Sequence, residues 1–317
     1  MSITSASITA NPNLLSASNL GPDHRAALEL TISNILSTDL AFETFAQVVD
    51  GIPICDAYFE YYSPKHRPEY LQNLKPSEEA CQIFKAFHAQ FHADMLQFAG
   101  NIAQAYQNAD PGSKTFNLRL MELIAIACHN IATRLYIEAD GGLRKPTGPP
   151  TLPPNRHPLL RPPPPKVAEL YHADYEDWEQ YPNGVADMVG YWAEYRLFGG
   201  VVIFDRGESG LECENAFIHP IDGHKIFQLS DHQIAHFTRF ALSEHQPPPT
   251  RRSYDTRFRA EKYARRVDPY DAMALHIYRD RYERKIPEVR PHSCVRWLED
   301  DPLLLDQYKL LIERHGG

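Results

Sequence analysis

Four side chains in the second half of the chain have the types needed for acid–base chemistry and anion binding: Glu194, Asp205, Arg206 and His219. A carboxylate or an imidazole can move a proton, and an arginine can hold the anionic group of a substrate. We predict that they line the pocket of an enzyme that acts on a small molecule. The alternative is a solvated face, on which Glu194 and Arg196 form a cross-strand ion pair.

Three histidines form a second candidate site. His88 and His92 in the stretch FHAQFHAD are four residues apart, which places both imidazoles on one face of a helix, as metal sites often require. His129 on the next expected helix could supply a third ligand. The spacing predicts a metal site, although boundary histidines and one hydrogen-bonded core histidine would have the same pattern.

The third candidate is electrostatic. Residues 251–290 contain 12 Lys and Arg against 7 Asp and Glu, whereas the whole chain has a net charge of −9. Arg251, Arg252, Arg265 and Arg266 lie among tyrosines, and basic segments with aromatics can bind RNA or another polyanion. The alternative is a pair of ionic helices that pack on the acidic residues 168–181.

A proline-rich segment separates the two halves of the chain. Residues 146–165 hold ten of the 26 prolines, a density that excludes a regular helix or a central strand. We expect residues 146–166 to form a linker or a strap on the protein surface. Because PxxP segments are ligands of SH3 and WW domains, a protein partner at this segment is the third functional class that the sequence suggests.

The remaining composition indicates a soluble protein in a reducing compartment. The five cysteines are far apart and form no C-x-x-C pair, and no stretch reaches the ~20 apolar residues of a membrane span. The N-terminus lacks the basic and apolar regions of a secretory signal. We therefore expect a cytoplasmic protein without a membrane partner. No phosphate-binding glycine motif is present, and the sequence names no cofactor.

The first half of the chain is predicted to be helical. Residues 1–21 are rich in Ser, Thr and Asn and are expected to be a disordered tail, and residues 22–145 form a helical region. Ser77 can cap a helix whose apolar stripe recurs at three- and four-residue steps as far as Ile102. Another helix starts near Phe116 and is apolar almost all round, so we expect it to be central and buried.

Residues 167–317 are predicted to form an α+β region with basic C-terminal helices. Alternation from Val189 to Leu197 favours a strand, followed by strands at 201–204, 215–219 and 225–228. Ser230 and Gln233 match a capping box that begins a helix. One or two helices are expected within 251–285, and a final helix near Trp297. The fold class is thus α+β, mainly α, with an N-terminal bundle and a small antiparallel sheet that share one core or form two domains.

The stretch VGYWAEYRLFGGVVIFDRGESG, which starts at Val189, resembles one found in a large family of filamentous-fungal proteins whose function is unassigned. Residues 217–220 (FIHP) and 300–302 (DDP) are similar too, so the resemblance covers about residues 167–305. A looser association is with fungal enzymes of specialised metabolism, including aminoacyl-tRNA-dependent cyclodipeptide synthases, though no motif of theirs matches residue by residue. This association implies an RNA-engaging transferase as an alternative function.

Overall fold

The computed structural model describes residues 14–59, 72–145, 167–221, 225–244, 253–286 and 288. Its helices are α1 (Pro22–Leu36), α2 (Asp39–Asp50), α3 (Cys55–Phe59), α4 (Glu78–Gln90), α5 (Gly100–Gln107), α6 (Lys114–Glu138), α7 (Val185–Phe198), α8 (Asp231–Ala241) and α10 (Pro269–Ala272). Its strands are β1 (Leu14–Ser16), β2 (Gln97–Ala99), β3 (Val201–Asp205), β4 (Ala216–His219), β5 (Ile226–Gln228), β6 (Arg266–Val267) and β7 (Ile277–Tyr278). The α+β, mainly α fold class is confirmed.

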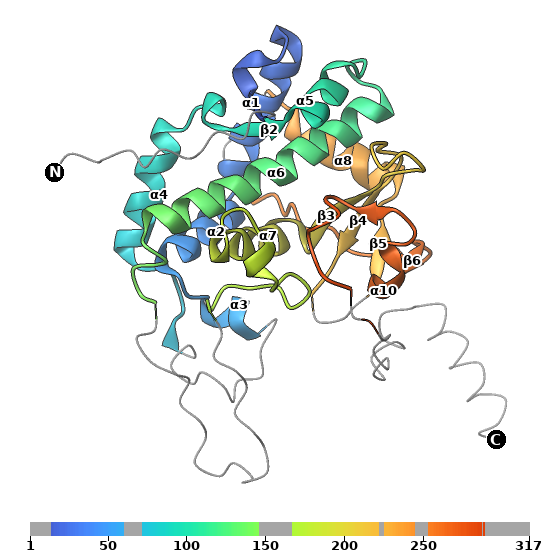
Figure 1. Cartoon of the computed structure of the whole chain (residues 1–317). Helices are drawn as coiled ribbons and strands as arrows, with labels where there is room; N and C mark the ends of the chain where they lie inside the picture. Colours follow the sequence, from blue (N-terminus) through green and yellow to red (C-terminus); the bar gives the residue numbers. More distant parts are fainter. Residues whose placement is uncertain are drawn as a thin grey trace, which may run out of the picture.

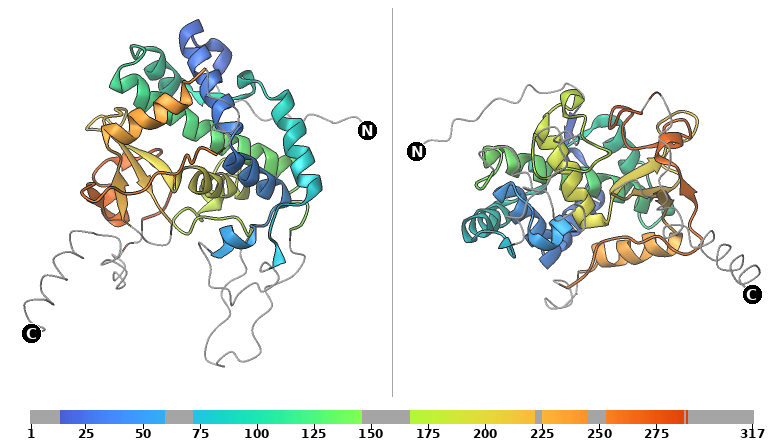
Figure 2. Two further views of the ribbon diagram at one scale, coloured as in Figure 1. Left: turned by 180° about the vertical axis from the view of Figure 1, so that it is seen from behind. Right: turned by 90° about the horizontal axis from the view of Figure 1, so that it is seen from below.

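Helix α6 runs through the middle of the protein, where it packs against α1, α2, α5, α7, α8 and strand β3 of the five-stranded sheet (Figures 1 and 2). The Ser113 side chain caps its N-terminus by accepting a hydrogen bond from the Phe116 amide, and most of its 25 residues are buried. In the described part of the chain it alone is long and apolar enough to cross a membrane. Because most of it is buried, it matches the core helix of a soluble protein.

The prediction of a strand from Val189 to Leu197 is wrong, because these residues belong to helix α7. All residues from Ala186 to Phe198 are buried, so apolar side chains occur on every face and the two-residue alternation carries no information about conformation. The helix packs along α6 and ends at Gly199, whose φ of 79° is the left-handed conformation typical of a residue just past a helix. The chain therefore passes from a helix cap at Gly199 almost directly into β3.

The five-stranded sheet is antiparallel throughout, in the order β6-β5-β4-β3-β7. The three strands predicted after residue 200 are present as β3, β4 and β5, and the capping box of Ser230 and Gln233 begins α8. Residues 253–286, by contrast, are mostly irregular rather than helical, and they supply both edge strands, β6 and β7. This segment therefore closes the sheet from both sides.

Two predictions for the N-terminal half need correction. Helix α4 starts after Ser77 as expected but ends at Gln90, and the apolar stripe continues through a 3-10 turn and β2 into α5. Residues 14–16 of the expected disordered tail form β1, which pairs with β2. The proline-rich residues 146–166, residues 1–13 and the expected helix near Trp297 lie outside the described residues.

Both halves of the chain contribute to a single hydrophobic core. Buried apolar side chains from α1 and α6 pack in the same cluster as those from α7, the sheet and α8. Within the described residues, the two halves therefore pack against each other through this cluster. Side chains far apart in the sequence are thereby brought to the boundary between α6, α7 and β3.

Candidate functional site

A cavity of about 300 Å³ lies where α5 and α6 meet the turn that follows β3 and the segment that follows β7. Helix α5 contributes polar carboxamides and two small apolar groups, and the turn contributes Gly210 and Leu211. The other three lining residues are arginines: Arg119, Arg206 and Arg279. Three guanidinium groups that meet at one hollow favour an anionic occupant.

Arg119 and Arg206 share one buried carboxylate. The Arg119 Nη1 atom lies 2.8 Å from Glu122 Oε2, and the Arg206 Nη2 atom lies 2.7 Å from Glu122 Oε1. All three side chains are at most 8% exposed, so the ion pairs are shielded from solvent. Arg119 also donates to the Leu211 carbonyl at 2.6 Å. These contacts use two of its five N–H donors, and the others remain for a ligand.

Arg206 holds the C-terminal segment against the end of β3. Its Nε and Nη2 atoms donate to the carbonyls of Tyr278 and Arg279 at 3.1 and 2.9 Å. Its Nη1 atom lies 3.4 Å from the Glu212 carbonyl. Nearly all of its N–H donors are therefore used within the protein. We infer that Arg206 mainly holds the cavity wall in place and contributes little to direct ligand binding.

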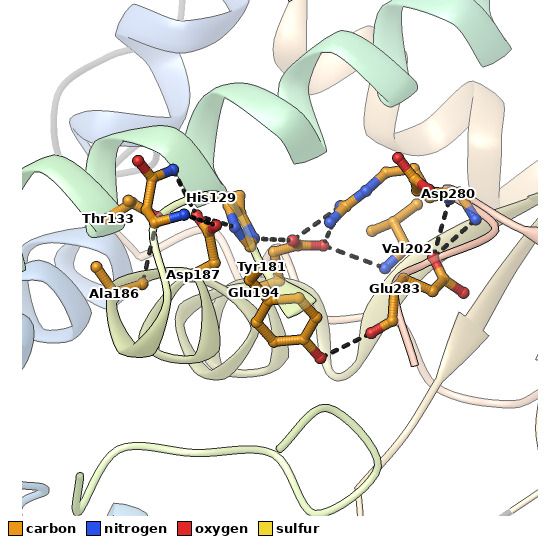
Figure 3. A network of polar contacts seen from close by, with 11 residues as sticks. His129, Thr133, Tyr181, Ala186, Asp187, Glu194, Val202, Asp280 and Glu283 are labelled. Atoms are coloured by element: carbon orange, nitrogen blue, oxygen red, sulfur yellow. Dashed lines mark hydrogen bonds and ion pairs between the residues drawn. The ribbon is translucent and has the colours of Figure 1, made fainter. Parts of the chain in front are cut away.

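Arg279 reaches α7, where Glu194 binds it. The Nη1 atom of Arg279 lies 2.8 Å from Oε1 and 2.7 Å from Oε2 of Glu194, and the guanidinium lies over the ring of Tyr191. Burial alone would lower the pKa of Arg279, but the nearby Glu194 carboxylate outweighs burial and raises this pKa above its usual value. The arginine is therefore charged. The amide of Val202 at the start of β3 also faces Glu194, at 3.4 Å (Figure 3).

His129 links Glu194 to a second carboxylate on α7. Its Nδ1 atom lies 2.9 Å from Glu194 Oε1, and its Nε2 atom lies 3.3 Å from Asp187 Oδ1 (Figure 3). Burial would lower the pKa of His129, but the hydrogen bonds to both carboxylates raise it above its usual value. Asp187 also accepts hydrogen bonds from the backbone and side chain of Asn183. A continuous polar chain thus runs from Asn183 to the cavity wall.

Gly190 makes room for this histidine on α7. A Cβ atom at Gly190 would lie 2.7 Å from Cε1 and Nε2 of the His129 ring, which is too close for a buried imidazole held on both sides. We expect Gly190→Ala to lower the free energy of unfolding by about 1–3 kcal/mol, although alanine is the better helix former. Urea unfolding measures this loss.

A double-mutant cycle separates the clash from a general effect on α7. His129→Ala removes the ring that the new methyl group would meet, so Gly190→Ala should cost less in that background. An equal cost in both backgrounds would show that the packing of His129 on Gly190 is not the cause.

His219, a predicted catalytic residue, belongs to a different buried group. Its Nδ1 atom lies 3.0 Å from the Tyr175 hydroxyl, and its Nε2 atom lies 3.5 Å from Asp174 Oδ2. His172 lies beside it and donates from Nε2 to the His219 carbonyl. Burial, together with Arg284 and His172, keeps the pKa of His219 well below its usual value, so the imidazole is neutral.

The four predicted catalytic residues do not form one site. Within the described residues, Glu194 and Arg206 are linked only through Arg279, whose side chain binds Glu194 and whose carbonyl accepts from Arg206. Asp205 is half-buried and accepts from the Gly207 amide in the turn, and it makes no hydrogen bond to the other three. The expected solvated pair of Glu194 and Arg196 is also wrong, because both are buried on a helix.

The metal-site prediction is wrong for the described residues, among which no group of three His, Cys, Asp or Glu side chains could hold a metal ion. Because α4 ends at Gln90, His92 lies outside the helix and is exposed, while His88 stacks on Phe84. His129 is held by two carboxylates instead.

The basic segment is only partly described. Arg251 and Arg252 lie outside the described residues. Arg265 is exposed and lies over the ring of Phe217, and Arg266 is part of edge strand β6. In place of the expected ionic helices, residues 253–286 contain one short helix, α10, and RNA binding by these arginines stays a prediction.

Arg119, Arg279 and Asp187 were missed as site residues. Arg119 and Glu122 are charged residues inside a helix that is apolar all round, and such a pair is a usable sign of a buried polar site. Asp187 is likewise a charged residue inside an otherwise apolar helix, α7. Arg279 lies 85 residues from Glu194, and nothing in the sequence links the two.

No known protein family, curated protein or solved structure matches this chain, so its function is argued from the geometry alone.

Proposed function

We propose that this protein binds a small organic anion in the cavity lined by Arg119, Arg206 and Arg279. The observation that supports this proposal is the convergence of three arginines, from α6, the turn after β3 and the segment after β7, whose side chains are at most 8% exposed. Buried arginines are rare unless they are paired. Two of these three have donors beyond those used for Glu122 and Glu194 in the contacts described above.

The cavity size supports a small ligand. A volume of about 300 Å³ is at the lower end of the range of small-molecule pockets, which starts near 300 Å³. The lining holds no carboxylate, imidazole, hydroxyl or thiol among the described residues, so the proposal concerns binding, and the enzymatic activity expected from the sequence is not part of it. A cytoplasmic location remains part of the proposal, and the four cysteines of the described residues are all free thiols.

Titration calorimetry with pentanoate tests the proposal, and Arg119→Gln is the most informative variant. It removes one guanidinium while Glu122 keeps its ion pair with Arg206 at 2.7 Å, so the fold is retained. Loss of a hydrogen bond to a charged group costs about 1.5–3 kcal/mol, so we expect the affinity to fall by about 10- to 150-fold.

Arg134→Gln is the matched control. Arg134 is a half-exposed residue of the same helix, paired with Glu138 on the surface, and its replacement should leave the affinity unchanged. Binding of pentanoate that Arg119→Gln and Arg134→Gln weaken equally would contradict the proposal, and so would the absence of binding to the unmodified protein.

A further inference from the structure

A histidine in a strained backbone conformation adjoins the turn of residues 206–212, which follows β3. Among the described residues, only Asp140 and His276 are non-glycine residues with a positive φ, of 50° and 59°. Residues with side chains rarely adopt this left-handed conformation, and they keep it only where their surroundings hold them. His276 lies between α10 and β7, directly before the strand that pairs with β3. Because such strain is concentrated at functional sites, the contacts of His276 point to a role.

His276 is bonded to two consecutive residues of the turn. Its carbonyl accepts a hydrogen bond from the Arg206 amide at 2.8 Å. Its Nδ1 atom contacts the Gly207 carbonyl, and since a carbonyl can only accept, the imidazole carries a proton on Nδ1 and donates it to this bond. The His276 amide donates to the Met273 carbonyl at 3.2 Å. These contacts hold the left-handed backbone in place, and the ring and the carbonyl together clamp the start of the turn.

The clamped turn forms one wall of the cavity. Arg206, Gly210 and Leu211 belong to it and line the hollow. The turn is only partly covered by the rest of the protein, and the Leu211 side chain is 60% exposed. A segment with so little buried apolar surface opens easily, so its hydrogen bonds to the body of the protein determine how well it is held.

The other end of the turn orients Arg119. The Arg119 Nη2 atom donates to the Leu211 carbonyl at 2.6 Å, and its Nη1 atom lies 2.8 Å from Glu122 on the same helix. One of the guanidinium groups that we propose to bind the anion is therefore oriented partly by the turn. A shift of the turn would move the Leu211 carbonyl and redirect the remaining donors of Arg119, and a binding site depends on such supporting contacts for its geometry.

From these contacts we infer that His276 is a positioning residue for anion binding: it fixes the turn of residues 206–212 and, through Leu211, the direction of Arg119. The inference rests on the proposed function, and it adds a residue outside the cavity lining on which the affinity of the same site depends. The strain at His276 maintains a wall that is already ordered before the anion arrives, so the anion does not have to order it.

Three variants of the full chain separate the imidazole of His276 from its backbone conformation. His276→Gly removes the donor but adopts a positive φ freely, and His276→Ala removes the donor and is strained there. His276→Asn tolerates this φ and keeps an N–H donor at the position of Nδ1. In calorimetry we expect pentanoate to bind about 2- to 10-fold more weakly to the glycine variant, the effect of one lost neutral hydrogen bond. The alanine variant should be weaker still, and the asparagine variant should regain most of the affinity.

Asp140→Ala is the matched control. It places alanine at the other positive φ, just beyond the end of α6 that is opposite to Arg119, so it should lower stability and leave the affinity unchanged. A second measurement needs no ligand. The amides of Arg206 and Glu212 donate to backbone carbonyls, and their hydrogen exchange should be faster in His276→Gly and His276→Ala but not in Asp140→Ala.

Several results would overturn the inference while anion binding stands. They are an alanine variant that binds pentanoate as the unmodified protein does, an asparagine variant no tighter than the glycine variant, and a loss of affinity in Asp140→Ala equal to that in His276→Ala. Unchanged exchange at Arg206 and Glu212 would overturn it as well, because the turn would then not depend on His276. If pentanoate does not bind the unmodified protein, the proposed function itself is overturned.

Discussion

Replacing Glu194 by alanine is expected to destabilise the protein by about 3–5 kcal/mol, the cost of leaving a buried charge without its partner. Glu194 is fully buried and binds both the Arg279 guanidinium and the His129 ring. Its loss leaves the Arg279 guanidinium and the His129 ring without the carboxylate that binds both. Urea unfolding at neutral pH measures the change.

Glu138→Ala is the control for this experiment, because Glu138 pairs with Arg134 on the exposed side of α6. An exposed pair of this kind contributes less than about 1 kcal/mol. Glu194→Gln keeps the shape and one hydrogen bond, so it should fall between the two and remain folded where the alanine variant does not. Equal losses for Glu194→Ala and Glu138→Ala would show that Glu194 is not the centre of the buried network.

The stability of the protein should also decrease on both sides of about pH 6.5, the usual pKa of histidine. The hydrogen bonds to Asp187 and Glu194 raise the pKa of His129 in the folded state against the effect of burial. The stabilisation from its charged form is therefore complete below about pH 6.5 and is lost as the pH rises through the folded-state pKa. The slope approaches about 1.4 kcal/mol per pH unit for one proton.

His172 and His219 produce the loss on the acidic side. Burial lowers the pKa of His172 to about 3 and that of His219 well below its usual value. Both are neutral in the folded protein and take up a proton when the chain unfolds, so stability falls as the pH drops below about 6.5. A rise in pH therefore removes the stabilisation that comes from His129, whereas a fall in pH removes the stabilisation that comes from His172 and His219.

Unfolding free energies of the unmodified protein and of His129→Gln, measured between about pH 5 and 8, separate the two effects. The glutamine cannot be protonated, so the variant should lose the decline above pH 6.5 and keep the decline below it. A variant whose decline above pH 6.5 equals that of the unmodified protein would show that His129 does not carry the raised pKa.

Local signals predicted several elements correctly. Ser77 caps α4, α6 begins close to Phe116, the Ser230–Gln233 capping box begins α8, and β3, β4 and β5 fall where β-branched and aromatic residues gather. These signals depend on residues within one helical turn or one strand, so they can be recognised in the sequence without knowledge of the fold.

The errors have a different cause. Helix α7 is buried on every side, so its apolar pattern could not reveal its period, and its packing against α6, α2 and β3 is not visible in the local sequence. Glu194 and Arg206, two residues of the predicted site, are both buried. Their connection is Arg279, which directly follows β7, the strand that pairs with β3. A contact set by sheet topology leaves no trace in local sequence.

The most direct test of the anion-binding cavity is a titration of the protein with pentanoate, in which NMR monitors the arginine Nε–Hε signals. Substitution of each arginine by lysine assigns its signal. We expect saturable shifts at Arg119 and Arg279, little change at the exposed Arg134, and loss of the shifts in Arg119→Gln. Signals of Arg119 and Arg279 that stay in place, or that move no more than that of Arg134, would contradict the assignment of this cavity as the binding site.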